Sequence, residues 1–342
     1  MPRLTRVTRS HAGWLLWGVA AVAAVVVGVA WFAPASDYLY LPNTASPLAD
    51  RVTVAGEKPR VGPGGIYYVD VTIRRATWAE QLLPFLRPEG ATLVPKADVV
   101  PPGSSFEARH EDGLKEMARS EKVAAAVALK EAGYHVPAKP LGALIEAVAT
   151  DAPAAKVLRS GDVIVAAFGK ETLTPEKLRR VFLGVKPGTV APLRVRRDGV
   201  LRTVKVKTVE APEQPGRAII GIRVAQSANI KLPRKVKIDL GQVGGPSAGL
   251  PFALDVLQEL GTDVDHGQRV VATGEIALDG SIGPIGGVKQ KTYGARRAHA
   301  DVFLVPAGEN AAEARRYAGN LRIIPVDNFQ QALAALTTAS QK

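Results

Sequence analysis

The segment Gly244-Gly245-Pro246-Ser247-Ala248-Gly249 stands between a predicted strand at 236–240 and a predicted helix that runs through 252–260. A serine in such a turn has three physical advantages. Its small neighbours let a substrate backbone approach, the helix N-terminus supplies unpaired N–H groups, and the helix dipole favours an anion there. These properties suit a serine nucleophile, but many phosphate-binding turns have a similar composition. The turn by itself therefore leaves both interpretations open.

The backbone N–H groups of this turn are candidates for an oxyanion hole, which binds the negative oxygen that forms when a serine attacks a carbonyl group. Pro246 has no N–H group, so it cannot donate. The expected donors are the backbone of Ser247 and a glycine just before the proline, either Gly245 or Gly244.

Two further segments follow the turn, Thr-Gly-Glu-Ile at 273–276 and Pro-Ile-Gly-Gly-Val-Lys-Gln-Lys at 284–291. In this order and spacing the three segments resemble the proteolytic domain of the Lon family. In Lon proteins the serine of the first motif and the second lysine of the third form a catalytic dyad. The resemblance therefore implies Ser247 as nucleophile and Lys291 as its general base. The threonine of the middle motif helps to hold that lysine, which implies a supporting role for Thr273.

A lysine acts as a base only when its amine is neutral, and its ordinary pKa is about 10.4. Burial or a nearby positive charge must therefore lower the pKa of this amine by several units. Lys289 and Lys291 lie two positions apart on one predicted segment, so helical geometry points them in different directions. One can therefore be buried while the other is solvated, and the resemblance implies that Lys291 is the buried one. The alternative is that both are exposed helix lysines.

A histidine base or a zinc site would be the alternative chemistry, and the histidines are His11, His110, His135, His266 and His299. The first three precede the predicted peptidase region. The other two stand in a polar loop and near a helix end, where solvated histidines are common. Their scattered positions show none of the spacings that bind zinc in peptidases, so we expect no metal.

The chain departs from ATP-dependent Lon enzymes in two ways. Gly244 stands where those enzymes often have an aspartate, so details of the oxyanion loop are expected to differ. No G-x-x-x-x-G-K-[ST] motif occurs in the sequence, which argues against a nucleotide-hydrolysing domain. We therefore expect an ATP-independent relative that needs no cofactor.

Residues 136–210 have the pattern of a compact β-rich module with a short helix that begins after Thr174. Its order of elements, and above all the run LRSGDVIVAAFG at 158–169, resembles a PDZ domain of the bacterial protease type. The resemblance implies that an extended peptide or free C-terminus binds as an added strand beside 143–148. The expected contact residues are Leu141, Gly142, Ala143 and Leu144, with the loop at Leu141-Gly142 facing the carboxylate. The alternative is a spacer domain without a ligand.

Residues 14–32 run without a charge, which is long enough to span a bilayer core of about 30 Å. Arg3, Arg6 and Arg9 precede this run and predict a cytoplasmic N-terminus with everything after the run outside. We interpret it as an uncleaved single-pass signal anchor. The alternative is a cleaved signal peptide, because Ala33-Pro34-Ala35 loosely fits a cleavage site.

The predicted fold class is an N-terminal transmembrane helix followed by an α+β protein, a PDZ-like β-rich domain and then a Lon-type α/β proteolytic domain. With the segments YLPNTASPL at 40–48, GGIYYVDVTI at 64–73 and MARSEKVAAAVAL at 117–129, the whole chain also loosely resembles a bacterial subgroup with the same organisation. In detail, we expect single strands at 66–73 and 218–224, the second of them opening the proteolytic domain. The predicted ranges are a basic tail at 1–13, the anchor at 14–32, a juxtamembrane α/β region at 36–135 that packs with the catalytic part, the PDZ domain at 136–210 and the proteolytic domain at 217–335.

Composition agrees with a folded exported domain. The chain has 46% hydrophobic residues, no cysteine and a formal net charge of +12. The absence of cysteine excludes disulfides and a cysteine nucleophile. The positive charge suits an anionic surface, and we find no nucleic-acid-binding motif.

Two functions remain at this stage. The first is a serine endopeptidase that cleaves exported or membrane-proximal polypeptides, with a PDZ domain that selects or gates them. The second is a non-catalytic membrane-anchored PDZ scaffold with a structural peptidase fold. The membrane and polypeptides are the expected partners, and assembly of copies into a ring is left open.

Overall fold

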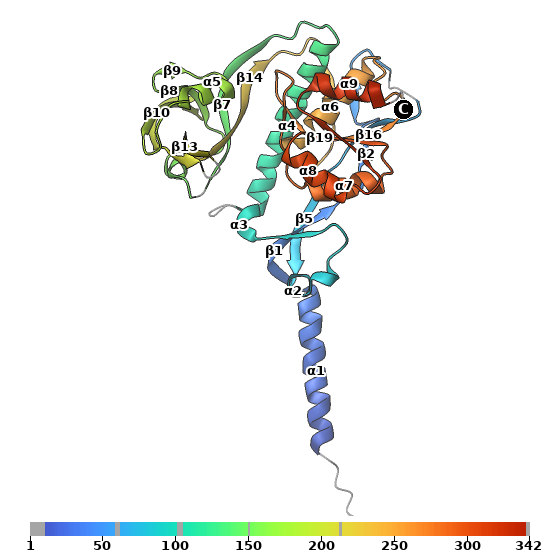
Figure 1. Ribbon diagram of the computed structural model, residues 1–342. Coiled ribbons are helices and arrows are strands. Elements are labelled where there is room, and N and C mark those ends of the chain that lie inside the picture. The colour runs from blue at the N-terminus through green and yellow to red at the C-terminus, as the bar shows by residue number, and fades with distance from the viewer. Residues whose placement is uncertain (1–10, 59–61, 101–104, 150, 212–213, 340–342) are drawn as a thin grey trace, which may run out of the picture.

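The computed structural model describes residues 11–58, 62–100, 105–149, 151–211 and 214–339. Among these, the side chains of residues 11–13, 15, 16, 26 and 176 are outside the description. Figure 1 shows three parts: a protruding N-terminal helix with a small sheet at its end, a β-rich part, and an α/β part. The long helix α4 (Phe106–Glu131) runs between the last two.

The N-terminal helix α1 (His11–Phe32) includes the predicted anchor and extends away from the rest of the molecule (Figure 1). A small sheet follows it, in the strand order β5-β1-β6. Within the described part of the chain, no helix combines the length and apolar character needed to cross a membrane. The elements around this sheet are β1 (Pro34–Pro42), β5 (Val71–Thr77), α2 (Trp78–Leu82), η1 (Pro84–Leu86), β6 (Thr92–Val94) and α3 (Lys96–Val99).

The α/β part is built on a five-stranded sheet in the order β2-β4-β16-β19-β20. The last four strands are parallel, and β2 runs antiparallel to β4. The strands are β2 (Ser46–Pro47), β4 (Gly65–Tyr68), β16 (Arg269–Ala272), β19 (Val302–Pro306) and β20 (Arg322–Val326), and the helices are α6 (Gly249–Glu259), α7 (Val288–Arg297), α8 (Glu309–Tyr317) and α9 (Phe329–Ala339). Two short pairs complete this part: β3 (Val52–Val54) with β15 (Val236–Ile238), and β17 (Glu275–Ile276) with β18 (Ile282–Gly283).

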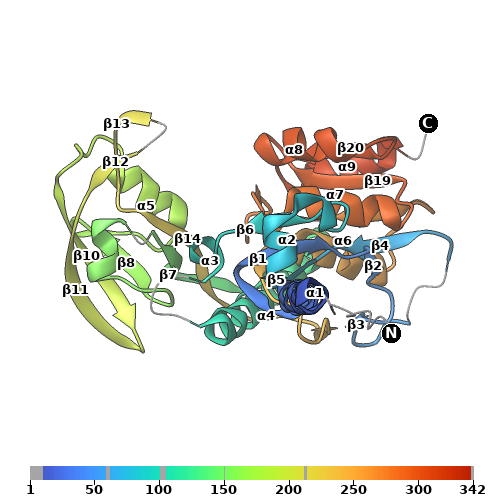
Figure 2. The ribbon, with the colours of Figure 1, turned by 90° about the horizontal axis from the view of Figure 1, so that it is seen from below.

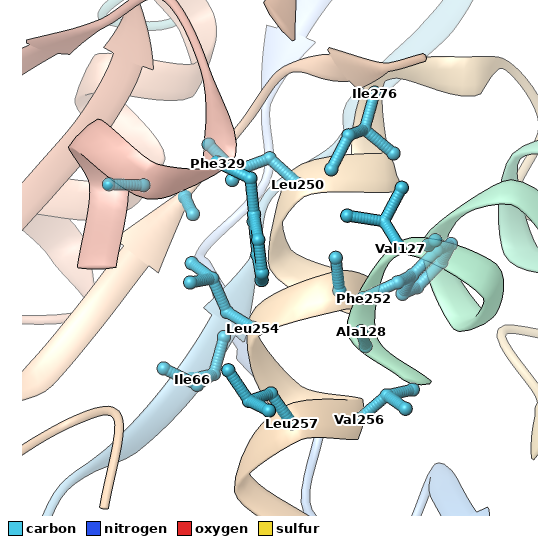
Figure 3. Packing of buried hydrophobic residues seen from close by; sticks show 14 of the residues in the cluster. Ile66, Val127, Ala128, Leu250, Phe252, Leu254, Val256, Leu257, Ile276 and Phe329 are labelled. Carbon is cyan, nitrogen blue, oxygen red and sulfur yellow. The ribbon is translucent and has the colours of Figure 1, made fainter. Parts of the chain in front are cut away.

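The main hydrophobic core lies around α6, in which every residue is buried. Phe252 points toward Val127 and Ala128 of α4, while Leu254 points toward Ile66 of β4 (Figure 3). Burying side chains of this size is worth about 1.5–3 kcal/mol each. Because α6 packs on both α4 and the sheet, the turn that precedes it has a rigid support.

The predicted single strand at 66–73 is wrong. The chain leaves the central sheet after Tyr68, and β5 begins at Val71 in the separate sheet with β1. Tyr68 and Val69 are both buried, so the regular alternation of faces breaks at this point. The alternating pattern at 66–73 continues across the break, so the sequence could not reveal that two sheets share this segment.

The β-rich part is one sheet in the order β11-β10-β8-β7-β14, with β9 paired to β8. It has its own hydrophobic core, separate from the core around α6. The Thr174 side chain caps α5, as predicted, by accepting a hydrogen bond from the N–H of Lys177. The elements are β7 (Ala138–Val148), η2 (Pro153–Lys156), β8 (Val163–Ala167), β9 (Lys170–Glu171), α5 (Pro175–Phe182), β10 (Val190–Arg197), β11 (Val200–Lys207) and β14 (Ile222–Ile230).

The expected strand at 218–224 is also wrong. The strand β13 (Gln214–Ile219) pairs with β12 (Val209–Ala211), the chain turns near Gly221, and β14 then pairs with β7. The strand β14 therefore extends the β-rich sheet, while β13 forms a separate two-stranded sheet with β12, and neither opens the α/β part. Figure 2 shows β14 and β7 on the side of the β-rich part that faces α4.

Candidate active site

Ser247 lies in the 3₁₀ turn η3 (Pro246–Ala248), directly before α6. Gly245 precedes it with a φ of 95°, a conformation that favours glycine. A Cβ at Gly249 would come within 2.8 Å of the side chains of Ile276 and Ser120. Glycine at both positions lets the turn fold closely against its neighbours and leaves Ser247 half-buried.

Lys291 and Thr273 meet Ser247 from two other elements. Lys291 is on α7, and its Nζ lies 2.7 Å from Ser247 Oγ and 3.1 Å from Thr273 Oγ1. Thr273 follows β16, and its Oγ1 donates a hydrogen bond of 3.1 Å to the backbone carbonyl of Ser247. The structure therefore brings together the three side chains that the sequence suggested, from segments far apart in the chain.

The environment of Lys291 favours the neutral amine. Its side chain is buried, with 4% of the residue exposed. Burial lowers the pKa of Lys291 to about 8, against the opposing charge of Asp70. A measurable fraction of the amine is therefore neutral near pH 7 and can accept a proton.

Asp70 is a site residue that the sequence did not suggest. It stands at the break between β4 and β5, and its Oδ2 accepts a hydrogen bond of 2.9 Å from Asn43. Its negative charge raises the pKa of Lys291. In the sequence, Asp70 stands inside the predicted strand at 66–73, and no motif marks it as a site residue.

Lys289 points away from the dyad. Its Nζ donates a hydrogen bond of 3.1 Å to the carbonyl of Ala91, and the ammonium lies 5.6 Å from the ring centre of Tyr317. The prediction that Lys291 is the buried lysine agrees with the structure. Lys289, however, is half-buried and has partners of its own, because the loop before β6 packs over α7.

In this structure the backbone N–H of Gly245 is not free to donate to an oxyanion. Its N–H donates a hydrogen bond of 2.8 Å to the carbonyl of Gly113 on α4. Gly244 is exposed and lies where a Cβ would be 3.0 Å from the Gly113 backbone. The Ser247 N–H stands in the first turn before α6, where helix geometry gives it no partner inside the helix. Of the predicted donors, Ser247 is the best placed.

The helix α4 supports the nucleophile turn, although the sequence indicated no role for it in the chemistry. Besides the contact at Gly113, the hydroxyl of Ser120 donates a hydrogen bond of 3.0 Å to the carbonyl of Pro246. Both contacts join residues more than 120 positions apart. Local sequence patterns could not reveal them.

Two acidic side chains, Glu275 and Glu146, lie near α4. Burial raises the pKa of Glu275 to about 7, and the charge of Glu146 adds to the effect. Glu146 on β7 is buried and lies 3.5 Å from both Arg119 of α4 and Arg223 of β14. This ion-pair cluster connects the β-rich part to α4.

The edge where a peptide was expected to bind is occupied by the chain itself. β14 pairs with β7 along its length, with Ala143 opposite Gln226 and Leu144 opposite Ala225. The Gln226 amide donates hydrogen bonds to the carbonyls of Gly142 and Leu173, at 3.4 and 2.9 Å. In this structure, extended backbone of β14 therefore already pairs with the edge where a peptide was expected to bind.

The alternative chemistries lack a site among the described residues. His266 lies 3.5 Å from Asp263, and His299 ends the turn after α7. In the described part of the chain, no group of three or more histidine or acidic residues is placed to hold a metal ion. A cavity of about 490 Å³ opens near Glu57 and Glu259, and no dyad residue lines it.

Comparison with known protein families assigns a class to this geometry. Residues 235–338 match the model of the Lon protease (S16) C-terminal proteolytic domain, and residues 107–208 match that of the PDZ domain. The chain is thus an α+β protein that carries a PDZ domain followed by a Lon-type proteolytic domain, and the latter is a serine peptidase domain.

Individual relatives match parts of the chain. A Lon protease 1 of Sorangium cellulosum is 32% identical over 139 residues, which are 36% of this chain and 16% of that protein. Lon protease 2 of Bacillus subtilis is 32% identical over 105 residues, 31% of this chain and 18% of that protein. A probable periplasmic serine endoprotease DegP-like protein of Pseudomonas fulva is 40% identical over 79 residues, 23% of this chain and 16% of that protein.

This chain therefore spans less than a fifth of the length of these curated relatives. Among solved structures, the PDZ domain of an SdrC-like protein of Listeria monocytogenes matches 24% of this chain and 86% of that one. The identity is 23% and the TM-score is 0.23.

Proposed function

We propose that this protein is an ATP-independent serine endopeptidase in which Ser247 is the nucleophile, Lys291 the general base and Thr273 a positioning residue. The observation that carries the proposal is the 2.7 Å contact between Lys291 Nζ and Ser247 Oγ. It lies in a site where burial lowers the pKa of the amine to about 8. Distance and proton affinity both suit transfer of the serine proton.

The first half of the reaction acylates the enzyme. The neutral Lys291 amine accepts the Ser247 hydroxyl proton while Oγ bonds to the substrate carbonyl carbon. The Ser247 N–H is placed to donate to the oxyanion that forms. The Lys291 ammonium then gives its proton to the departing amine nitrogen as the C–N bond breaks, which leaves an ester on Ser247.

The second half releases the product. A water molecule gives a proton to the neutral Lys291 amine and adds to the ester carbonyl, and the proton returns to Ser247 Oγ as the C–O bond breaks. Thr273 keeps the geometry through both halves, because its Oγ1 accepts from Lys291 Nζ and donates to the Ser247 carbonyl.

The direct test is the Ser247→Ala variant. Incubation of the wild-type protein with an activated ester should give an acyl adduct on the peptide that contains Ser247, detected by mass spectrometry. Ser247→Ala should show neither this adduct nor cleavage of unfolded casein, while its circular dichroism spectrum stays unchanged. An adduct of equal yield on Ser247→Ala would refute the assignment. Added ATP should leave the wild-type rate unchanged.

The rival function is a non-catalytic scaffold. Burial of a lysine whose pKa falls from 10.5 to about 8 opposes folding by about 3 kcal/mol at neutral pH. In a purely structural domain nothing would offset this loss of stability, and an apolar residue at position 291 would make the fold more stable. The buried amine at hydrogen-bonding distance from Ser247 therefore favours the enzyme.

We further propose that the enzyme is anchored in the cell membrane, with its N-terminus in the cytoplasm, and cleaves exported or membrane-proximal polypeptides. The uncharged run at 14–32 supports this location. So does an apolar surface at the end of α1, where α2 contacts it. Phe32, Leu82 and Phe85 are 82%, 67% and 79% exposed there. Comparing the protein N-termini of cells that carry wild-type or Ser247→Ala protein would identify the substrates.

A further inference from the structure

The strand β14 occupies the β7 edge in the way that a bound peptide would. The two strands are antiparallel, and β14 runs from Ile222, opposite Val148, to Ser227, opposite Gly142. A C-terminal peptide that added to β7 would run in the same direction, with its carboxylate toward the loop at 141–142. In place of a carboxylate, the chain continues through Ser227 toward Ile230.

The side chains of β14 also fill the position of a ligand. Ile222 and Val224 pack against the core of the β-rich part, where Val181 and Phe182 of α5 pack as well. Near the C-terminal end of β14, the Gln226 amide donates a hydrogen bond of 2.9 Å to the Leu173 carbonyl. β14 is therefore held by main-chain pairing, apolar packing and a polar anchor, as an added strand would be.

The same strand contributes to the support of the active site. Arg223 of β14 and Arg119 of α4 both lie 3.5 Å from the buried carboxylate of Glu146. The helix that carries Arg119 holds the nucleophile turn through the carbonyl of Gly113 and the hydroxyl of Ser120. Loss of Arg223 from the cluster would leave Glu146 with fewer counter-charges and change how α4 is held.

We infer that β14 is an internal ligand of the PDZ domain, and that the free C-terminus of a polypeptide activates the peptidase by displacing it. Displacement withdraws Arg223 from Glu146 and loosens α4. The Gly245 N–H then separates from the Gly113 carbonyl and becomes a second oxyanion donor beside Ser247. The activation half of this inference rests on the proposed function, whereas the exchange of strands does not.

The first test locks β14 in place. The chain has no cysteine, so Leu144→Cys with Ala225→Cys introduces a single pair at directly opposed positions. Oxidation should link the strands, and dithiothreitol should release them within the same protein. Each single cysteine variant, treated in the same way, controls for the substitutions and the redox conditions.

The probe is a synthetic peptide with the sequence of residues 217–226, RAIIGIRVAQ, whose free carboxylate would lie at the loop near Gly142. Binding is measured by fluorescence anisotropy in the Ser247→Ala background, so that the probe survives. The reduced protein should bind it and the oxidised protein should not, and a C-terminally amidated peptide should bind more weakly. Val224→Ala should bind it more tightly than the parent, because this change weakens only the competing β14.

The second test measures coupling to the site. In the Ser247→Ala background, the peptide should speed hydrogen exchange of the Gly245 amide in the reduced form alone. In active protein it should raise casein cleavage by about fivefold or more, again only when reduced. Equal or no peptide binding in the two redox states would overturn the exchange of strands. Binding without faster exchange at Gly245 would overturn the coupling, and faster exchange without any cleavage would refute the proposed function alone.

Discussion

Lys291 and Lys289 are two positions apart on α7, yet their surroundings are opposite. Lys291 is buried between Ser247 and Thr273, whereas Lys289 reaches the loop at Ala91. An α-helix turns by 100° per residue, so side chains two positions apart point in widely different directions. Only one of the two amines can therefore serve Ser247.

We predict that Lys291→Met lowers the rate of casein cleavage by about 10²–10⁴, which is the usual contribution of general acid–base catalysis. Methionine keeps the length and apolar packing of lysine but has no basic nitrogen. Lys289→Met is the matched control and should retain activity within about tenfold of wild type, because its amine contacts Ala91 and Tyr317. Initial rates with equal amounts of folded protein decide this, and similar losses in both variants would contradict the dyad.

We predict that kcat/KM rises with pH through about 8 and then levels off. Burial lowers the pKa of Lys291 to about 8, so below this value the neutral, active amine increases roughly tenfold per pH unit. Asp70→Asn should shift the profile toward lower pH, because the charge of Asp70 raises the pKa of Lys291. A profile that is flat from about pH 6 to 9 would argue against a lysine base.

At the scale of elements, α7 positions Lys291 by packing closely against the N-terminal segment. Gly294 makes this approach possible, since a Cβ there would lie 2.1 Å from the carbonyl oxygen of Asn43 and 2.7 Å from the side chain of Val69. The Gly294 carbonyl also accepts a hydrogen bond of 3.1 Å from the N–H of Ala45. The segment around Asn43 therefore contacts α7 through its backbone. The side chain of Asn43 also donates a hydrogen bond to Asp70.

We predict that Gly294→Ala destabilises the protein by about 1–3 kcal/mol, because the backbone of Asn43 must move. Gly113→Ala is the matched control, as it is also a helix glycine but a Cβ there would meet its neighbours at 3.5 Å, an ordinary contact. Alanine favours a helix over glycine, so Gly113→Ala should be neutral or stabilising by up to about 1 kcal/mol. Urea unfolding measures both, and equal stability of the two variants would contradict the close packing.

At the scale of the whole molecule, α4 connects the two large parts. One of its faces joins the main core through Val127 and Ala128, and Arg119 reaches Glu146 of the β-rich sheet. Gly113 and Ser120 on the same helix hold the nucleophile turn. The helix α4 therefore contacts both the PDZ domain and the nucleophile turn, so the two domains are joined by packed structure as well as by the chain between them.

We predict that the folded domains lie outside the cytoplasmic membrane and stay attached to it. Protease added to intact spheroplasts should degrade the β-rich and α/β parts, and the protein should sediment with membranes after a carbonate wash. Replacing Val22 and Val25, which are exposed on α1, with aspartate should release it. A wild-type protein found soluble, with Ala35 or a neighbour at its N-terminus, would show that the segment is a cleaved signal peptide.

The sequence by itself determined the class of domain and suggested the three side chains of the dyad site. Ser247 stands in a turn before a helix, Thr273 directly after a strand and Lys291 in the first turn of a helix, and their three short motifs have the order and spacing of the Lon proteolytic domain. The turn alone left the role of Ser247 open, and the resemblance of the three motifs to the Lon family implied the roles of all three residues. The capping of α5 by Thr174 could be predicted from the local sequence, since a cap joins residues three positions apart.

Only the tertiary structure decided which long-range partners these residues have. The pairing of β14 with β7, the bond from Gly245 to Gly113 and the approach of Asp70 to Lys291 all join distant segments. Main-chain hydrogen bonds carry no side-chain signature, so an apolar strand such as 218–224 fits either sheet equally well as a sequence. Its place depends on which strand edge and which carbonyl the folded chain presents, and that is a property of the packed molecule.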